Sequence, residues 1–110
     1  MSRYYSMTIT IGDYSPKHER AIIEAISKEW NFSDPGTISA RDGEIRAQGE
    51  DFLSGGDTDE DFSEGVARSV WKVNDGFCDV EVTATCLEDL PTEFYSFDGE
   101  AYAEMMGKAV

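Results

Sequence analysis

The sequence predicts an α+β protein whose elements follow the order β-α-β-β-α-β. Two segments, "RYYSMTITI" and "FCDVEVTATCL", alternate apolar and polar side chains at the two-residue period of a half-buried strand. Two other segments place apolar side chains at helical spacing, and a short hairpin pattern lies between them. This is the ferredoxin-like order, in which two helices cover one face of an antiparallel sheet. A C-terminal hairpin is expected as an extension of that core.

A single domain is expected over residues 1–110, with the ferredoxin-like core over 1–90 and the extension over 91–110. A chain of 110 residues has the usual size of one domain, and its apolar content of 40% is sufficient for one core. The chain contains no run of about 18 apolar residues, so no membrane span is predicted.

The two cysteines and the N-terminal segment predict a cytoplasmic protein. Cys78 and Cys86 fall on one predicted strand, which would hold them roughly 26 Å apart, far beyond the reach of a disulfide. The segment "MSRYYSMTIT" lacks the apolar stretch of a secretory signal. Free thiols without such a signal are typical of the cytosol.

The first strand and the first helix follow from their apolar spacing. Residues 3–11 are predicted to form the strand. Its buried face carries Tyr5, Met7, Ile9 and Ile11. The helix is predicted to begin with Ser15 as N-cap and Pro16 at the first helical position. Its apolar stripe consists of Ile22, Ile23, Ile26 and Trp30.

The hairpin between the two helices has the sequence "TISA-RDG-EIRAQ", over residues 37–48. Ile38 and Ala40 are matched to Ile45 and Ala47, so that the four apolar side chains share one face. The segment that follows, "EDFLSGG", is predicted to be a loop.

The second helix is predicted to begin at Thr58, with acidic side chains filling its first turn. Its apolar face is predicted to consist of Phe62, Val66, Ser69, Val70 and Val73. Asn74-Asp75-Gly76 ends the helix, with Gly76 in the left-handed conformation. This orientation places Trp71 on the outward side of the helix.

The last core strand spans residues 77–87. Its inward side carries Cys78, Val80, Val82, Ala84 and Cys86. Its outward side carries Asp79, Glu81, Thr83 and Thr85. After Pro91, "EFYSF-DG-EAYAEM" predicts a hairpin that turns at Asp98-Gly99. A short helix over 100–107 is the competing prediction, because Ala, Glu and Met favour helix.

The formal net charge of −14 is the most unusual property of the chain, and it is unevenly distributed. Residues 1–49 carry seven acids and six bases, whereas residues 50–104 carry sixteen acids and only Arg68 and Lys72 as bases. Such a field repels nucleic acid and anionic lipid and attracts basic protein surfaces. Solubility alone is the simpler explanation of the same charge.

No metal or cofactor site is predicted. Asp57, Asp59 and Asp61 stand at positions 1, 3 and 5 of a calcium-binding loop, but Phe62 and Arg68 occupy the positions that require glycine and glutamate. Zinc is not expected, because the chain has a single histidine and its two thiols are far apart.

Catalysis and direct nucleic-acid binding are not predicted either. The one available nucleophile–base pair would combine a cysteine with His18, but both cysteines fall on the apolar side of their strand. The chain has no phosphate-binding loop and no dinucleotide fingerprint. The open sheet face is expected to carry acids and threonines rather than the aromatic platform and basic rim that bind RNA.

The candidate partner-binding residues are the carboxylates of the second half together with Trp71. On one side of a strand, Asp79 and Glu81 would stand roughly 7 Å apart, about the spacing of neighbouring phosphates. An outward Trp71 among charges would be an interface anchor, unless the C-terminal aromatic side chains fold back and cover it. The full set is Asp57, Asp59, Glu60, Asp61, Glu64, Trp71, Asp79, Glu81, Glu88, Asp89 and Glu93.

The short length, the strong acidity, the ferredoxin-like order and the lack of catalytic motifs give this chain its overall character. In that character it resembles small inhibitors of host defence encoded by phages and mobile elements, of the anti-CRISPR or anti-restriction type. The resemblance implies a non-enzymatic inhibitor that binds the basic surface of a CRISPR effector or restriction enzyme, in some such proteins by mimicking DNA. It rests on no family motif, so it assigns no residue, and it leaves monomer and homodimer open.

Two other functions remain as alternatives. The chain could be a small ferredoxin-like enzyme or ligand-binding domain that dimerises through its sheet. Its pocket would then lie between the sheet and the C-terminal extension, lined by Cys78, Val80 and the C-terminal tyrosines. It could also be an accessory domain whose acidity serves only solubility.

Overall fold

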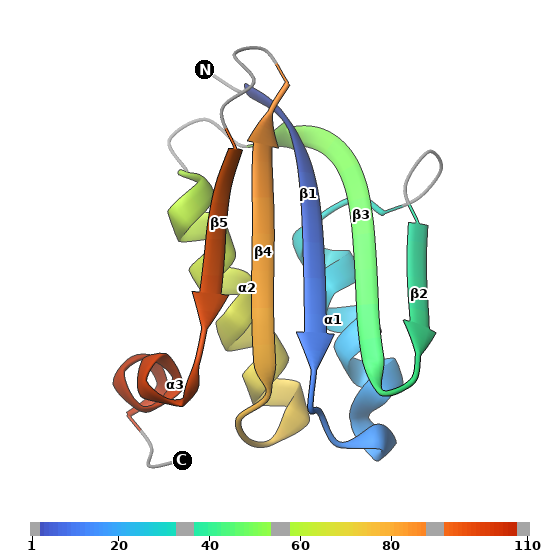
Figure 1. The fold of residues 1–110 in the computed structure, drawn as a ribbon, viewed down its shortest axis with the longest axis vertical. Coiled ribbons are helices and arrows are strands. Elements are labelled where there is room, and N and C mark those ends of the chain that lie inside the picture. The colour runs from blue at the N-terminus through green and yellow to red at the C-terminus, as the bar shows by residue number, and fades with distance from the viewer. Residues whose placement is uncertain (1–2, 33–36, 54–57, 88–91, 108–110) are drawn as a thin grey trace.

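The computed structural model describes residues 3–32, 37–53, 58–87 and 92–107, and it consists of one five-stranded antiparallel sheet and its helices (Figure 1). The strand order is β2-β3-β1-β4-β5. The strands are β1 (Arg3–Gly12), β2 (Thr37–Arg41), β3 (Glu44–Leu53), β4 (Asp79–Cys86) and β5 (Thr92–Phe97). The helices are a 3-10 turn (Pro16–His18), α1 (Glu19–Glu29), α2 (Asp59–Asn74) and α3 (Gly99–Met106).

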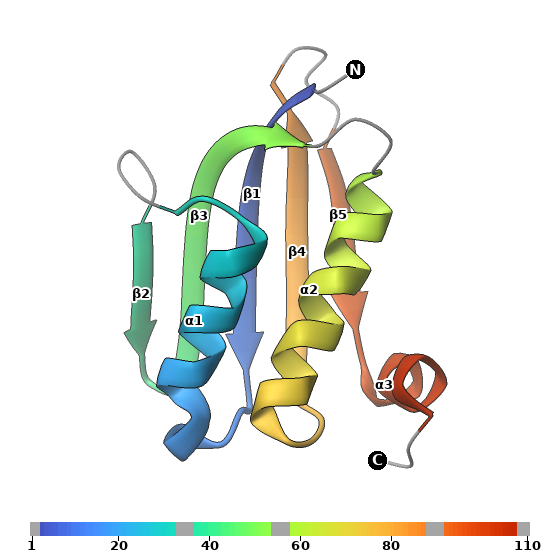
Figure 2. The same cartoon turned by 180° about the vertical axis from the view of Figure 1, so that it is seen from behind.

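The helices α1 and α2 lie side by side on one face of the sheet (Figure 2), and neither of them covers the other face, which Figure 1 shows. The predicted α+β class, with two helices on one face of an antiparallel sheet, is therefore confirmed. The strand order differs from the four-stranded ferredoxin-like sheet that the sequence predicts, because residues 92–97 pair with β4 and extend the sheet as β5.

The predicted C-terminal hairpin is wrong, and the competing helix is correct. Asp98 does not turn the chain back into a second strand; its side chain instead accepts a hydrogen bond of 2.9 Å from the Ala101 N–H and caps α3. The ring of Tyr102 then packs edge-on against Trp71, with 5.1 Å between centroids. The local sequence allows either outcome, and this packing favours the helix.

The core lies between the sheet and the two long helices. The alternation predicted for β1 and β4 is confirmed, because every second side chain of each strand is buried against the helices. The side chains without exposed surface include Met7, Ile9, Ile11, Ile22, Ile26, Val66, Val70, Val80 and Val82.

The hairpin and the strand that follows it differ in length from the prediction. Asp42 and Gly43 form a two-residue turn with φ of 55° and 75°, the conformation that such turns require. Ile38 pairs with Ala47, as expected for one shared face. Residues 50–53, predicted as loop, extend β3, because β1 continues to Arg3 and pairs with them throughout.

The helix α2 begins as predicted but is rotated about its axis. The side-chain oxygen of Thr58 accepts the Asp61 N–H at 3.0 Å, which is the expected N-cap. The fully buried face is turned toward Ser63, Ala67 and Trp71, and Trp71 is only 1% exposed. The predicted outward position of Trp71 is therefore wrong, because β5 and α3 cover that side of the helix.

The end of α2 also differs in detail. Asp75, with φ of 59°, takes the left-handed position that was predicted for Gly76. The buried Asn74 side chain accepts the Ser15 N–H at 2.9 Å and donates to the Gly76 carbonyl at 3.1 Å. These bonds tie the end of α2 to the segment that leads into α1.

Candidate functional site

The exposed acids of the first two turns of α2 and of β5 lie together on the helix side of the sheet. The helix packs through its opposite side, which leaves Glu60 and Asp61 exposed and Asp59 and Glu64 half-buried. Glu93 pairs with Ala84, whose side chain is buried under the helices, so Glu93 also points to that side. We call this set the α2–β5 acidic surface: Asp59, Glu60, Asp61, Glu64 and Glu93.

Tyr95 connects the two elements of this surface. It pairs with the buried Val82, so its ring also points to the helix side, where its hydroxyl lies within the electrostatic influence of the Asp59 carboxylate. The pKa of Tyr95 is raised to about 12, first by burial and then by the interaction with Asp59 and the charges of Glu93 and Glu60. One phenol thus lies within the electrostatic reach of three carboxylates from two separate segments.

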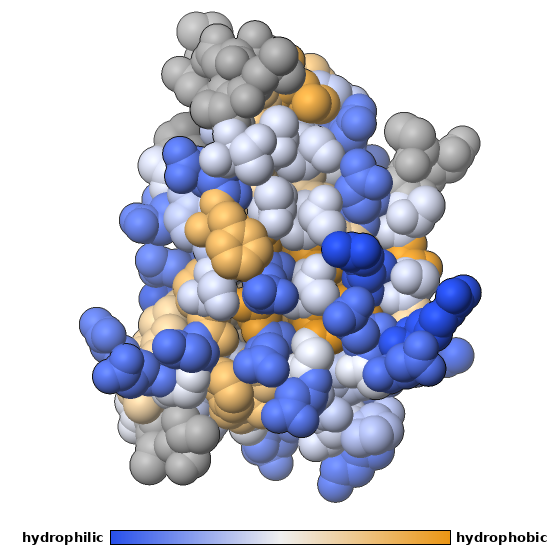
Figure 3. Space-filling model, in the orientation of Figure 1, coloured by the Kyte–Doolittle hydropathy of each residue, from blue (hydrophilic) through white to orange (hydrophobic). Residues whose placement is uncertain are grey.

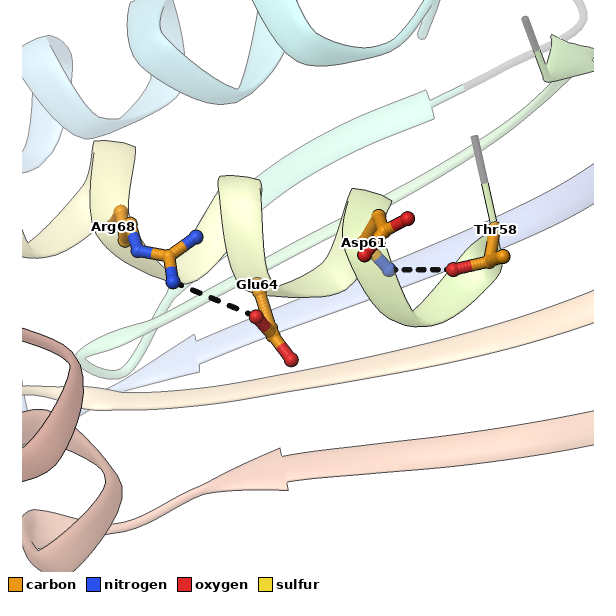
Figure 4. A network of polar contacts seen from close by, with 4 residues as sticks. All are labelled: Thr58, Asp61, Glu64 and Arg68. Atoms are coloured by element: carbon orange, nitrogen blue, oxygen red, sulfur yellow. Dashed lines mark hydrogen bonds and ion pairs between the residues drawn. The ribbon is translucent and has the colours of Figure 1, made fainter. Parts of the chain in front are cut away.

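The positive charge on this part of the surface is already engaged (Figure 4). Arg68 forms an ion pair with Glu64, one turn earlier on α2, at 3.5 Å. It is the only ion pair within 4.0 Å between side chains in the described ranges. An exposed pair of this kind contributes about 0–1 kcal/mol to stability. The other carboxylates of the surface are therefore not neutralised by a described basic side chain at contact distance.

Asp79 and Glu81 lie on the opposite side of the sheet. Glu81 pairs with Thr10 and Ser96 on the open face, and Arg46 belongs to the same row. Figure 3 shows hydrophilic and apolar side chains mixed on this face, and the row that holds both Glu81 and Arg46 means that it is not uniformly acidic. The sheet thus divides the predicted acidic set in two, while Asp57, Glu88 and Asp89 lie outside the described residues.

The open face carries two exposed aromatic side chains that sequence reasoning missed. Phe52 is 60% exposed and Phe94 is 59% exposed. Phe52 packs edge-on against Tyr4 with 4.8 Å between ring centroids. The sequence pattern predicts a loop at residues 50–53 and a separate hairpin around residue 94, so it does not place either ring on the sheet face. Alternation with the buried Leu53 is the signal that could have located Phe52.

Trp71 belongs to the core and cannot act as an exposed anchor in this conformation. Its indole N–H donates to the Cys78 carbonyl at 2.8 Å, and the rings of Phe97 and Tyr102 lie edge-on to it. These side chains occupy the region between sheet and extension where the alternative function requires a pocket. Burial, followed by the charges of Asp79 and Asp13, raises the pKa of Cys78 to about 12, which keeps its thiol neutral.

Two concave regions border the acidic surface. A groove of about 620 Å³ lies among the ends of α1 and β3 and the start of α2, and its lining includes Asp51, Asp61 and Phe62. A hollow of about 500 Å³ lies among α2, β5 and α3. The second hollow is lined by Glu64, Arg68, Ser96, Phe97, Ala101, Glu104 and Met105.

The described residues contain no group of three or more histidine, cysteine or acidic side chains arranged to hold a metal ion. Of the helices in the described ranges, none has the length and apolarity needed to cross a bilayer. Comparisons of the chain with protein-family models, with characterised proteins and with solved structures found no match.

Stability is expected to fall as the pH rises above 10. The pKa of Tyr95 is raised to about 12 from its ordinary value of 10.0, so the unfolded chain loses this proton first. The contribution of the protonated Tyr95 hydroxyl to the free energy of unfolding is complete below pH 10, and it is lost as the pH rises toward 12. Urea denaturation at a series of pH values measures this decline.

The variant Tyr95→Phe isolates the contribution of Tyr95. Its free energy of unfolding should fall less steeply with pH than that of the wild type, although a decline should remain. Tyr14, whose pKa is also raised to about 12 by burial and by the hydrogen bond that it donates to Glu19, titrates in the same range. Equal slopes for wild type and variant would mean that Tyr95 is not buried beside Asp59.

Proposed function

We propose that this protein is a non-enzymatic inhibitor that binds a basic, nucleic-acid-handling protein through the α2–β5 acidic surface. A CRISPR effector or a restriction enzyme is the partner class that its overall character favours. The observation that carries the proposal is the convergence of carboxylates from α2 and β5 around Tyr95, beside one arginine that is already paired with Glu64.

The mechanism would be occupation of a phosphate-binding surface. Lysine and arginine side chains that normally hold nucleic-acid phosphates would instead meet exposed carboxylates such as Glu60 and Asp61. The net charge of −14 would steer the two proteins together and speed their association. Nucleic acid would then be excluded from the partner by competition, without any chemical step.

Binding is expected to weaken strongly with salt, because the Debye length falls from about 30 Å at 0.01 M to about 8 Å at 0.15 M ionic strength. The assay is affinity capture on the immobilised protein, first from a panel of purified restriction enzymes and CRISPR effectors, at these two ionic strengths. Cleavage of target DNA by each captured enzyme is then measured with and without the protein.

The decisive variant is the double charge reversal Glu60→Lys/Glu64→Lys. It should weaken binding by about tenfold or more, because it places repulsive charges on the acidic surface. The matched control is Asp79→Lys/Glu81→Lys, which changes the net charge equally but on the opposite face of the sheet. Equal losses in both variants would mean that only net charge matters, and no loss in either would indicate that the acidity serves solubility.

A further inference from the structure

The strand β5 forms one edge of the sheet, and in the described part of the chain no strand lies beyond it (Figure 1). The backbone hydrogen bonds of an antiparallel sheet alternate from one side of a strand to the other. The Leu87 N–H donates to the Tyr4 carbonyl at 2.9 Å, so Leu87 and every second residue before it direct their backbone groups toward β1. The residues between them, including Ala84 and Val82, therefore direct theirs toward β5.

The same alternation determines the direction of the backbone groups in β5. Ala84 pairs with Glu93 and Val82 pairs with Tyr95, so these β5 residues are hydrogen-bonded to β4. Phe94 and Ser96 consequently point their N–H and C=O groups outward, away from β4. Among the described strands, none uses these outward donors and acceptors, which are of the kind that pairs with an added strand.

The side chains around this edge are also suited to an added strand. Phe94, 59% exposed, lies on the open side of the edge. The hollow on the other side is lined by the carboxylates Glu64 and Glu104 and by Arg68, which forms an ion pair with Glu64. Successive side chains of an added strand would alternate between the two sides. One set would contact the Phe94 ring, and the other would enter the hollow, where Glu104 carries a charge that Arg68 does not pair with.

The opposite edge of the sheet has a different character. The same alternation turns the backbone groups of Ile38 and Ala40 outward from β2. The charged side chains where β2 pairs with β3 are two arginines, Arg41 and Arg46, and one carboxylate, Glu44. A basic segment would meet arginines there, whereas β5 contains no lysine or proline that would block pairing and is flanked by carboxylates.

We infer that β5 is a docking edge for an extended, basic segment of a partner protein, which adds to the sheet as a further strand through the backbone of Phe94 and Ser96. The basic character of that segment rests on the proposed function. A second copy of this chain is disfavoured as the occupant, because β5–β5 pairing would bring two acidic surfaces together.

Amide hydrogen exchange measured by NMR tests this inference on the intact protein. In the free protein the Phe94 and Ser96 amides should exchange faster than those of Tyr95 and Phe97, which face β4. The probe is a synthetic peptide that alternates lysine or arginine with valine or threonine. Its binding should slow exchange at Phe94 and Ser96 by about tenfold or more. The control peptide keeps every charge but replaces the alternate valines and threonines with proline.

A pair of edge variants provides a second test. Ser96→Pro removes one outward N–H without removing a hydrogen bond to β4, because proline is tolerated on that side of an edge strand. It should weaken binding of the parent peptide by about tenfold. Ala40→Pro is the matched control, since it removes an outward N–H from β2, and it should leave peptide binding unchanged.

The outcomes separate this inference from the proposed function. If both peptides bind equally and the Phe94 amide is not protected, the edge is not the docking site, while the acidic surface still attracts basic chains. If protection of Phe94 in the free protein disappears on dilution, a second copy occupies the edge and the inference is wrong. If neither peptide binds at low salt, the edge has no basic occupant and the inference is wrong. The proposed function is tested separately: it fails if Glu60→Lys/Glu64→Lys leaves affinity capture of the partner enzyme unchanged.

Discussion

Replacing Trp71 by alanine is expected to lower the free energy of unfolding by about 3–5 kcal/mol, the usual cost of deleting a large buried aromatic ring. The indole is 1% exposed and contacts the rings of Phe77, Phe97 and Tyr102. Its removal would leave a cavity where α2, β5 and α3 meet, and it would leave the Cys78 carbonyl without the indole N–H. Urea denaturation followed by circular dichroism measures the loss.

A second substitution at the same position separates packing from binding. Trp71→Phe keeps an aromatic ring but loses the indole N–H that donates to Cys78, so it should cost less than Trp71→Ala. Partner binding per folded molecule should be unchanged in Trp71→Phe. A variant that stays as stable as the wild type but loses binding would show instead that Trp71 is an exposed anchor.

Gly49→Ala is expected to destabilise the protein by about 3 kcal/mol through overpacking. A Cβ atom at this position would lie 2.2 Å from the Asn31 carbonyl oxygen and 3.2 Å from the Phe32 Cα. These are backbone atoms of the segment that leaves α1, and Trp30 holds that segment to β3 by donating its indole N–H to the Gly49 carbonyl at 2.9 Å. The chain cannot accommodate the methyl group without moving α1 relative to the sheet.

Gly65→Ala is the matched control for this steric effect. Gly65 lies inside α2, and a Cβ atom there would meet no atom within 4 Å apart from its chain neighbours and the backbone of its own helix. Alanine is the better helix former, so this variant should be more stable than the wild type by about 0.5–1 kcal/mol. The comparison uses the midpoint and slope of urea unfolding. Similar losses for the two alanine variants would contradict the close approach of Asn31 to β3.

The local sequence was sufficient to predict most of the elements of this fold. The alternation of β1 and β4, the Thr58 cap of α2 and the Asp42-Gly43 turn are each decided by residues that are neighbours along the chain. A two-residue period can bury one face of a strand without reference to the rest of the protein, and a cap needs only the next turn of the helix. The heavily acidic composition and its location after residue 50 are likewise properties of the sequence alone.

The rotation of α2 could not be predicted from its own sequence. Its helical pattern is consistent with an apolar face centred on Phe62, Val66 and Val70, and only the arrival of β5 and α3 buries Trp71. The "DG" at 98–99 is ambiguous for the same reason. It is typical of a hairpin turn, but Asp98 is equally suited to cap a helix, and the packing of Tyr102 on Trp71 favours the helix.

The candidate site was predicted in composition but not in arrangement. Asp59, Glu60, Asp61 and Glu64 were expected on one helix, and their place on α2 follows from the sequence. The alternation of β4 predicted correctly that Asp79 and Glu81 face the open side of the sheet, whereas the place of Glu93 on the helix side follows from the pairing of β5 with β4. The sequence determines the charge of each side chain and the helix or strand that carries it. Which distant charges share its face depends on strand register and helix rotation. Both are set by the burial of apolar side chains from segments far apart in the sequence.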